Sequence, residues 1–148
     1  MMSFGRPKQN SKPPLRLHNT LSGELEAFEP LGKTVKMYNC GPTVYDHQHI
    51  GNLRPYIFAD TLARALGAWG YPLKQVINIT DVGHLTGDNL GDADTGEDKM
   101  EKSARASGRS AQEIAAEITG AWFEDLDALG IDRAKIEFPR ATHYIGEQ

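Results

Sequence analysis

Side chains that could bind a nucleotide are concentrated in residues 40–52, in the run CGPTVYDHQHIGN. Thr43 and Tyr45 supply hydroxyl groups, and His47 and His49 supply imidazoles. An imidazole donates hydrogen bonds to phosphate oxygens, more strongly when it is protonated. A polar cluster of this composition indicates phosphate binding, and its meaning depends on which elements hold it.

Cys40 is the only cysteine in the chain. A cysteine thiolate is a good zinc ligand, but zinc requires at least two or three further protein ligands. The alternative is a structural role, because a lone cysteine commonly behaves as a small hydrophobe. A single cysteine excludes an internal disulfide framework and fits a reducing compartment, so we predict a cytoplasmic protein.

His49 and Gly51 lie where a strand and loop give way to a helix. A helix start carries free N–H groups and the positive end of the helix dipole, which favour phosphate. Gly51 allows a backbone or ligand to come close. The alternative for His49 is a surface or capping residue.

The elements around this run predict a βαβ unit. Residues 35–40 alternate apolar and polar side chains, which is typical of a strand, and residues 73–80 form a second strand. Between them, residues 52–69 have helical spacing and end at Gly70, with Phe58, Leu62, Ala65, Leu66 and Trp69 on the apolar stripe. The two strands should be parallel, with a right-handed crossover. Residues 40–52 would then lie at the carboxyl end of the first strand, where open α/β sheets bind ligands.

A second helix is predicted over residues 110–129. Ser110 and Glu113 form a capping box. An apolar stripe follows and ends at Gly130; it comprises Ile114, Ile118, Ala121, Trp122, Leu126 and Leu129. Both tryptophans, Trp69 and Trp122, are interpreted as core residues.

The rest of the chain is expected to be less regular. Residues 1–14 are predicted to be a flexible leader, followed by extended chain from Leu15 with a turn at Ser22 and Gly23. Residues 83–98 form a polar, acidic loop. Residues 15–148 are therefore interpreted as one domain.

The bulk composition limits the class of protein. The chain has 148 residues, of which 39% are apolar and 24% charged, which is typical of a globular protein. No apolar run reaches the ~20 residues that span a bilayer, so no membrane is expected as a partner. A net charge of −4 argues against a main RNA-binding surface in these residues.

Two parallel strands are too few for a closed sheet, which predicts an incomplete half of a doubly wound α/β domain. One strand should then present an unpaired edge, and the stripe of Trp122 and Leu126 should lack part of its partner surface. We expect the isolated chain to self-associate or to be only marginally stable.

The run MYNCGPTVYDHQHIGN resembles the start of the catalytic domain of cysteinyl-tRNA synthetases, a family of class I aminoacyl-tRNA synthetases. The resemblance continues in LRLHNTLSGELEAFEP, in INITDVGHLTGDNLGDADTGEDKMEKSA and in FEDLDALGI with FPRATHYI. It implies a Rossmann-type (HUP-like) fold, of which this chain carries the N-terminal half. The implied activity is the ATP-dependent, Mg-assisted activation of cysteine and its transfer to tRNA(Cys).

The resemblance also implies roles for single residues. Cys40 matches one of four zinc ligands, the others being Cys, His and Glu beyond residue 148. The ATP-binding motif matches Pro42, Thr43, Tyr45, His49, Gly51 and Asn52, with His49 and Asn52 catalytic. Gly41 and Thr80 match positions in the cysteine pocket. We expect the isolated chain to be inactive, because three metal ligands and the Lys-Met-Ser-Lys-Ser motif of the family would lie downstream.

Two features depart from the family pattern. Asn52 stands where the family usually has a second histidine; it can donate a hydrogen bond but never carries a charge. The string Lys99 to Ser103, KMEKS, resembles the lysine motif but lies too early in the chain, so we interpret it as a coincidence.

Two alternative functions remain open from the sequence. The first is a cysteine ligase of thiol biosynthesis, which shares the fold and cysteine activation but attaches cysteine to an amino-sugar. The second is a non-catalytic half-synthetase. Cysteine-dependent ATP–pyrophosphate exchange separates the second from both enzymes, and the acceptor used separates the two enzymes.

Overall fold

The computed structural model describes residues 13–82 and 108–147. In chain order the elements are β1 (Arg16–Asn19), β2 (Glu24–Ala27), β3 (Val35–Asn39), α1 (Ile50–Ala68), β4 (Leu73–Ile77), α3 (Ala111–Ala128), the 3-10 turn η1 (Arg133–Lys135), β5 (Ile136–Glu137) and the 3-10 segment η2 (Ala141–Glu147). The predicted acidic loop, the KMEKS string and most of the predicted leader fall outside the described residues.

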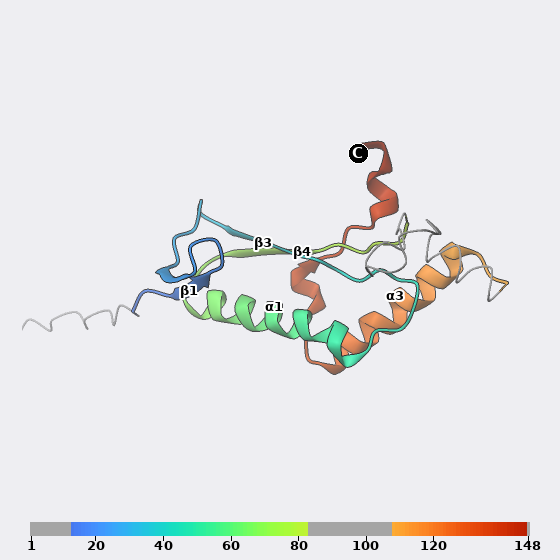
Figure 1. Cartoon of the computed structure of the whole chain (residues 1–148), viewed down its shortest axis with the longest axis horizontal. Helices are drawn as coiled ribbons and strands as arrows, with labels where there is room; N and C mark the ends of the chain where they lie inside the picture. The colour runs from blue at the N-terminus through green and yellow to red at the C-terminus, as the bar shows by residue number, and fades with distance from the viewer. Residues whose placement is uncertain (1–12, 83–107, 148) are drawn as a thin grey trace, which may run out of the picture.

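A parallel sheet with the strand order β3-β4-β5 forms the centre of the fold (Figure 1). Val35 pairs with Leu73 and Asn39 with Ile77, so the two predicted strands are parallel, as expected. β5 pairs with β4 at Gln75 and Val76 and is a third parallel strand that the sequence pattern did not predict. β5 has only two residues, which are too few to show the alternation of apolar and polar side chains that predicts a strand.

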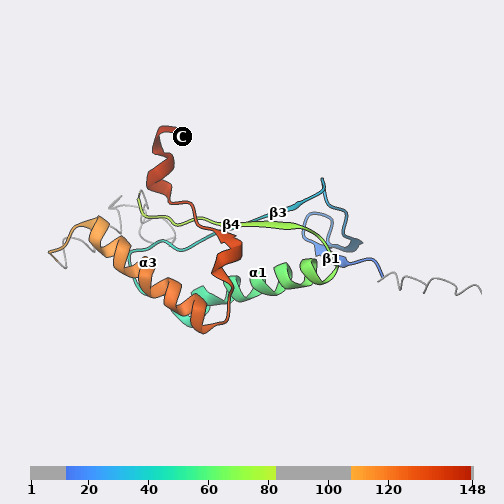
Figure 2. The ribbon, with the colours of Figure 1, turned by 180° about the vertical axis from the view of Figure 1, so that it is seen from behind.

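The helices α1 and α3 lie on the same face of the sheet (Figures 1 and 2). Ile77 and Ile79 of the second strand segment are each 1% exposed and belong to one core cluster with residues of α1 and α3. Its other buried members are Val44, Tyr56, Ala59, Ile114, Ala115, Ile118, Trp122, Leu126 and Ile131. This cluster lies beneath the carboxyl half of the sheet, and the candidate site is built on it.

Trp122 is the centre of an aromatic cluster within this core. Its ring contacts Tyr56 of α1 at 5.3 Å, Phe123 at 5.2 Å and Phe138 at 5.6 Å between centroids. Trp122 and Leu126 are 1% and 0% exposed, so the expectation that their stripe lacks partner surface is wrong. The segment carrying β5 and Phe138 supplies the missing surface.

A second, smaller core lies at the amino end of β3. Leu15, Val35 and Leu66 are buried there, and Phe28 packs edge-on against Tyr71 at 5.3 Å. β1 and β2 form an antiparallel hairpin, and Gly23 has a φ of 76° in its turn, as predicted from Ser22 and Gly23. The hairpin is therefore attached to the βαβ unit at the end opposite the candidate site.

The predicted helices are confirmed, with corrections to their faces. α1 begins at Ile50, two residues early, because His49 caps it, and Gly70 ends it with a φ of 88°. Phe58 is 68% exposed and Trp69, at the helix end, is 39% exposed, so neither is a core residue as predicted. Leu129, the last residue of the second stripe, is also 38% exposed, whereas the Ser110–Glu113 capping box forms as expected.

The chain after β5 returns to the end of β4. Ile79 and Arg140 form an isolated parallel bridge, in which the Ile79 N–H donates to the Pro139 carbonyl at 2.8 Å. η2 then leads away from the sheet on the side opposite the helices (Figure 1). None of the helices in the described ranges is both long enough and apolar enough to cross a membrane.

Candidate functional site

The carboxyl ends of β3 and β4 are joined beyond the regular strands. The Thr80 N–H donates to the Pro42 carbonyl at 2.9 Å, and the Val44 N–H donates to the Thr80 carbonyl at 3.1 Å. Thr43 and Thr80 thereby form an isolated parallel bridge. Four of the predicted site residues, from Gly41 to Thr43 together with Thr80, are brought together by this ladder although they lie far apart in the sequence.

Gly41 is the point of closest approach between the two strands. A Cβ atom at Gly41 would lie 1.5 Å from the carbonyl oxygen of Asn78, a distance at which no side chain fits. The Gly41 N–H donates to Oδ1 of Asn78 at 2.9 Å. Glycine is therefore required at position 41 by the backbone of the neighbouring strand.

Cys40 lies beside this junction with an exposed thiol that forms no disulfide. Burial raises the pKa of the Tyr56 phenol, with a smaller electrostatic contribution from Cys40. Within residues 13–82 and 108–147 no group of three or more His, Cys, Asp or Glu side chains could hold a metal ion. Cys40 fits a metal as one donor, and the described residues do not complete a site around it.

His49 and Asn52 hold each other at the start of α1. The Gly51 N–H donates to Nδ1 of His49 at 3.0 Å, and the His49 N–H donates to Oδ1 of Asn52 at 3.2 Å. This reciprocal pair is a capping box, in which two N–H groups at the helix start are satisfied by side chains. The capping role considered for His49 is therefore observed. It uses only one ring nitrogen, Nδ1, so a phosphate role for the other nitrogen, Nε2, stays a prediction.

The cap fixes the tautomer of the His49 ring. Because Nδ1 accepts a hydrogen bond, the proton of the neutral ring is on Nε2. The ring also explains the glycine at position 51, because a Cβ atom there would lie 2.9 Å from Cε1 of His49. The N–H groups of Asn52 and Leu53 donate to the His49 carbonyl at 2.9 and 3.2 Å. With Nδ1 of His49 and Oδ1 of Asn52 engaged in the cap, the side-chain donors that these two residues can offer to a ligand are Nε2 of His49 and Nδ2 of Asn52.

The two other predicted side chains of this run are placed differently. Tyr45 is half-buried and packs against the main core cluster, while His47 is exposed, with its backbone N–H donating to Oδ1 of Asp46 at 2.8 Å. The loop containing both runs from the end of β3 to the start of α1 (Figure 1).

Two residues at the junction, Asn78 and Asp81, were not predicted from the sequence. Asn78 bridges the two strand ends, because its Nδ2 donates to Oγ1 of Thr80 at 3.2 Å. The Asp81 side chain is 6% exposed and accepts hydrogen bonds from the N–H and Oγ1 of Thr142, at 2.9 and 2.8 Å, and lies 3.5 Å from Nη1 of Arg140. Polar residues directly after a buried apolar strand are the signal that could have identified both.

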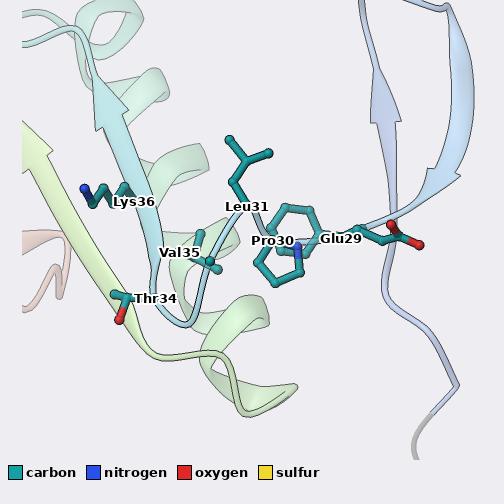
Figure 3. A pocket seen from close by; sticks show the side chains of 8 residues that line it. Glu29, Pro30, Leu31, Thr34, Val35 and Lys36 are labelled. Carbon is teal, nitrogen blue, oxygen red and sulfur yellow. The ribbon is translucent and has the colours of Figure 1, made fainter.

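A separate hollow lies at the far end of β3, between the hairpin and the sheet. It has a volume of about 410 Å³ and is lined by residues 28–32 and 34–36. Figure 3 shows Glu29 and Lys36 pointing to opposite sides of it, so its charged groups do not converge. Among the described residues, the polar side chains that converge therefore lie at the carboxyl end of the sheet.

Known proteins of one family resemble this chain over most of its length. A family model for the class I (C) tRNA synthetase catalytic domain matches residues 27–148. The cysteine--tRNA ligase of Novosphingobium aromaticivorans is 53% identical over 133 residues, which are 89% of this chain and 26% of that relative. Those of Treponema denticola and Burkholderia lata (cysteine--tRNA ligase 1) are each 51% identical, over 90% and 91% of this chain and 26% and 28% of the relatives.

The chain thus spans about a quarter of the length of the curated relatives that it matches. The three-stranded parallel sheet with its helices is consistent with part of a Rossmann-type fold. Since the family match extends over most of the sequence, the chain belongs to the family of class I (C) tRNA synthetase catalytic domains.

Proposed function

We propose that the protein carrying this chain is a cysteine--tRNA ligase, which activates cysteine with ATP and transfers it to tRNA(Cys) in the cytoplasm. The observation that carries the proposal is the junction at the carboxyl ends of β3 and β4, which pairs Thr43 with Thr80 and links Gly41 to Thr80 through Asn78, in a chain half identical to cysteine--tRNA ligases. In this proposal, residues 15–148 form the first half of the catalytic domain.

The first chemical step is a displacement at phosphorus. A carboxylate oxygen of cysteine attacks the α-phosphate of ATP, the bond to the bridging oxygen breaks, and pyrophosphate leaves with its electron pair. No covalent enzyme intermediate is needed, so the protein contributes positioning and stabilisation of the charge on the phosphate oxygens. A hydroxyl of the tRNA then attacks the carbonyl carbon of cysteinyl-adenylate, and AMP leaves.

His49 supports the first step through its Nε2–H. The hydrogen bond to Nδ1 holds the ring and keeps the proton of the neutral ring on Nε2, which can then donate to a phosphate oxygen. Asn52 can donate from Nδ2 while its Oδ1 accepts the His49 N–H in the cap. In each of the two side chains, one polar atom is held by the cap and the other is left to donate to ATP.

Cys40 is the residue of this chain that would contribute to a zinc site. A bound zinc ion would select cysteine by binding the substrate thiolate, which the hydroxyl of serine cannot replace at neutral pH. The rest of such a site would have to come from outside the described residues.

The direct test uses the longest natural protein that contains this chain. We expect cysteine-dependent ATP–pyrophosphate exchange, little exchange with serine, and attachment of cysteine to tRNA(Cys). Attachment to an amino-sugar with no tRNA charging would establish the thiol-biosynthesis ligase instead. Absence of exchange with folded protein, ATP, Mg and zinc present would leave the non-catalytic half-synthetase.

A further inference from the structure

A hollow lies between α1, the amino half of β4 and the short segment that leads into β5. Its volume is about 430 Å³, which is within the range of small-molecule pockets. It shares no residue with the junction at the carboxyl ends of β3 and β4, so it is separate from the candidate site.

Gln75 of β4 presents a polar acceptor to this hollow. The residue is 4% exposed and lines the hollow, and its Nε2 donates to Oδ1 of Asn39 at 3.0 Å. Oε1 of Gln75 accepts no hydrogen bond from the described residues. Of the fully buried polar side-chain atoms in the described ranges, only Nε1 of Trp122 has no partner. Oε1 of Gln75 is therefore not fully buried, and it is reached from the hollow.

The wall on the helix side is made of small residues. Ala63 and Gly67 of α1 lie one turn apart and both line the hollow, opposite Leu73 and Ile136. Glycine weakens a helix relative to alanine, and a Cβ atom at Gly67 would meet no atom within 4 Å. No contact within the molecule therefore requires glycine at this position, and its effect is to leave the hollow open.

The charged side chains around the hollow neutralise one another. Nε of Arg64 lies 2.6 Å from Oδ2 of Asp60, and Nζ of Lys135 lies 2.8 Å from Oδ2 of Asp132. Arg64 is held further by a hydrogen bond from Nη2 to the Gly130 carbonyl at 2.7 Å. With two acids and two bases in pairs, the hollow favours a neutral ligand, since a charged one would lose hydration without an unpaired counter-charge.

We propose that this hollow is a binding site for a small neutral heteroaromatic molecule that donates an N–H hydrogen bond to Oε1 of Gln75. A buried amide oxygen is ordinarily hydrogen-bonded, and the donor here has to come from the hollow. A rigid ring fills apolar space with little loss of conformational freedom. The inference goes beyond the proposed function and does not depend on it.

Indole and benzofuran are matched probes for this contact. The two molecules have nearly the same shape, but benzofuran has an oxygen atom in place of the N–H group. In an NMR titration of the intact protein, we expect indole to bind more tightly, by roughly two- to tenfold for one net hydrogen bond. In Gln75→Leu the acceptor is lost, so the two ligands should bind with equal affinity.

Gly67→Leu tests the location of the site without a loss of fold. The new side chain would project into the hollow, so the affinity for both ligands should fall at least about tenfold, in keeping with the loss of a buried apolar contact. The melting temperature should not fall, because a Cβ atom at position 67 meets no neighbour and leucine favours a helix. Gly120→Leu in α3 is the matched control, since a Cβ atom there also meets no atom within 4 Å, and its affinities should equal those of the wild type.

Three results would overturn the inference. They are equal binding of indole and benzofuran to the wild type, including no binding of either, a preference for indole that survives in Gln75→Leu, and binding that is unchanged in Gly67→Leu. Cysteine-dependent exchange is a separate measurement. Its absence would remove the proposed function and leave this site in place.

Discussion

At the start of α1, the residue that departs from the family pattern has a structural task. Oδ1 of Asn52 accepts the His49 N–H, and His49 in turn accepts the Gly51 N–H. From the sequence, Asn52 differs from the usual histidine in that it can donate a hydrogen bond but never carries a charge. The structure adds that Asn52 orients the neighbouring histidine.

Two substitutions at Asn52 separate its capping role from its proposed contact with phosphate. Asn52→Ala removes the acceptor and should lower the free energy of unfolding by about 1 kcal/mol. Asn52→Asp keeps the acceptor and adds a negative charge that favours the helix start, so stability should be retained. ATP affinity should nevertheless fall in Asn52→Asp, because the carboxylate repels phosphate. Thermal unfolding and ATP binding by calorimetry measure the two effects; loss of stability in both variants would contradict the cap.

Gly41 is the second residue with a demand that is visible only in three dimensions. Gly41→Ala should markedly lower the melting temperature and abolish cysteine-dependent exchange, because the new methyl group would overlap the Asn78 carbonyl. Gly120→Ala in α3 is the control, since a Cβ there meets no atom within 4 Å. It should stabilise by about 0.5–1 kcal/mol through helix propensity. Similar melting temperatures for the two variants would show that the strands can separate at Gly41.

At the scale of the elements, the main core depends on one aromatic contact set. α3 packs Trp122 against Tyr56 of α1 and Phe138 beyond β5, so a single side chain joins both helices to the third strand segment. Trp69, which ends α1, instead donates from Nε1 to the Pro13 carbonyl at 2.8 Å. The two tryptophans therefore differ in role although both were predicted to be core residues.

The two tryptophans should differ in both stability and fluorescence. Trp122→Ala should cost about 3–5 kcal/mol and leave little folded chain, whereas Trp69→Ala should cost much less. Because the chain has two tryptophans, the conservative variants report them separately. Trp69→Phe, which retains Trp122, should emit at shorter wavelength than Trp122→Phe. Equal emission maxima would mean that Trp122 is not buried.

The end of α3 is tied to η1 by an ion pair whose pH dependence can be measured. Asp127 accepts from Nε and Nη2 of Arg133 at 2.6 and 2.7 Å, and Arg133 lies over the Phe123 ring at 4.6 Å. The hydrogen bond from Arg133 lowers the pKa of Asp127 below its usual range. A lowered folded-state pKa means stability that is present above the unfolded value and is lost as pH falls through the folded value.

Asp127→Asn should therefore lower the melting temperature at neutral pH and lose this effect in acid. The difference from the wild type should be small, since the pair is partly solvent-exposed. It should be constant above about pH 5 and shrink below about pH 4, where aspartate begins to be protonated. Arg133→Gln should show the same pH profile, and the double variant no further loss. A difference that persists unchanged at about pH 2 would contradict the ion pair as its cause.

At the scale of the molecule, the described sheet is covered on one face. Tyr38 of β3 is 68% exposed on the opposite face, and β3 pairs only with β4 among the described residues. The prediction of an unpaired edge thus concerns β3, because β5 occupies the other side of β4. Self-association of the isolated chain remains a prediction.

Light scattering after size exclusion, over a range of concentrations, tests self-association of the 148-residue chain. We expect its mean mass to rise with concentration, since exposed strand edges pair with other chains. Tyr38→Lys should reduce this rise by placing a charge on the open face next to the edge. Leu21→Lys is the matched control, because Leu21 is 94% exposed in the β1–β2 turn, away from the sheet. A strictly monomeric chain, or an equal effect of both variants, would contradict the prediction.

Much of the fold could be predicted from the sequence because its signals are local. Helix caps such as Ser110 with Glu113, terminating glycines such as Gly70, and the strands of the βαβ unit depend on residues close together in the chain. The family likeness depends on the order of motifs along the sequence, and the family match confirmed it. Residues 40–52 were predicted from their residue types to be the centre of the site, and this remains a prediction.

Only the tertiary structure decided how distant segments meet. β5 is two residues long, and its pairing with β4 depends on the path of the whole chain after α3. The burial of Trp122 follows from that pairing, and the exposure of Phe58 follows from which face of α1 the sheet covers. The contacts of Asn78 with Gly41 and Thr80 join strand ends that only the parallel register places side by side, so no local pattern could reveal them.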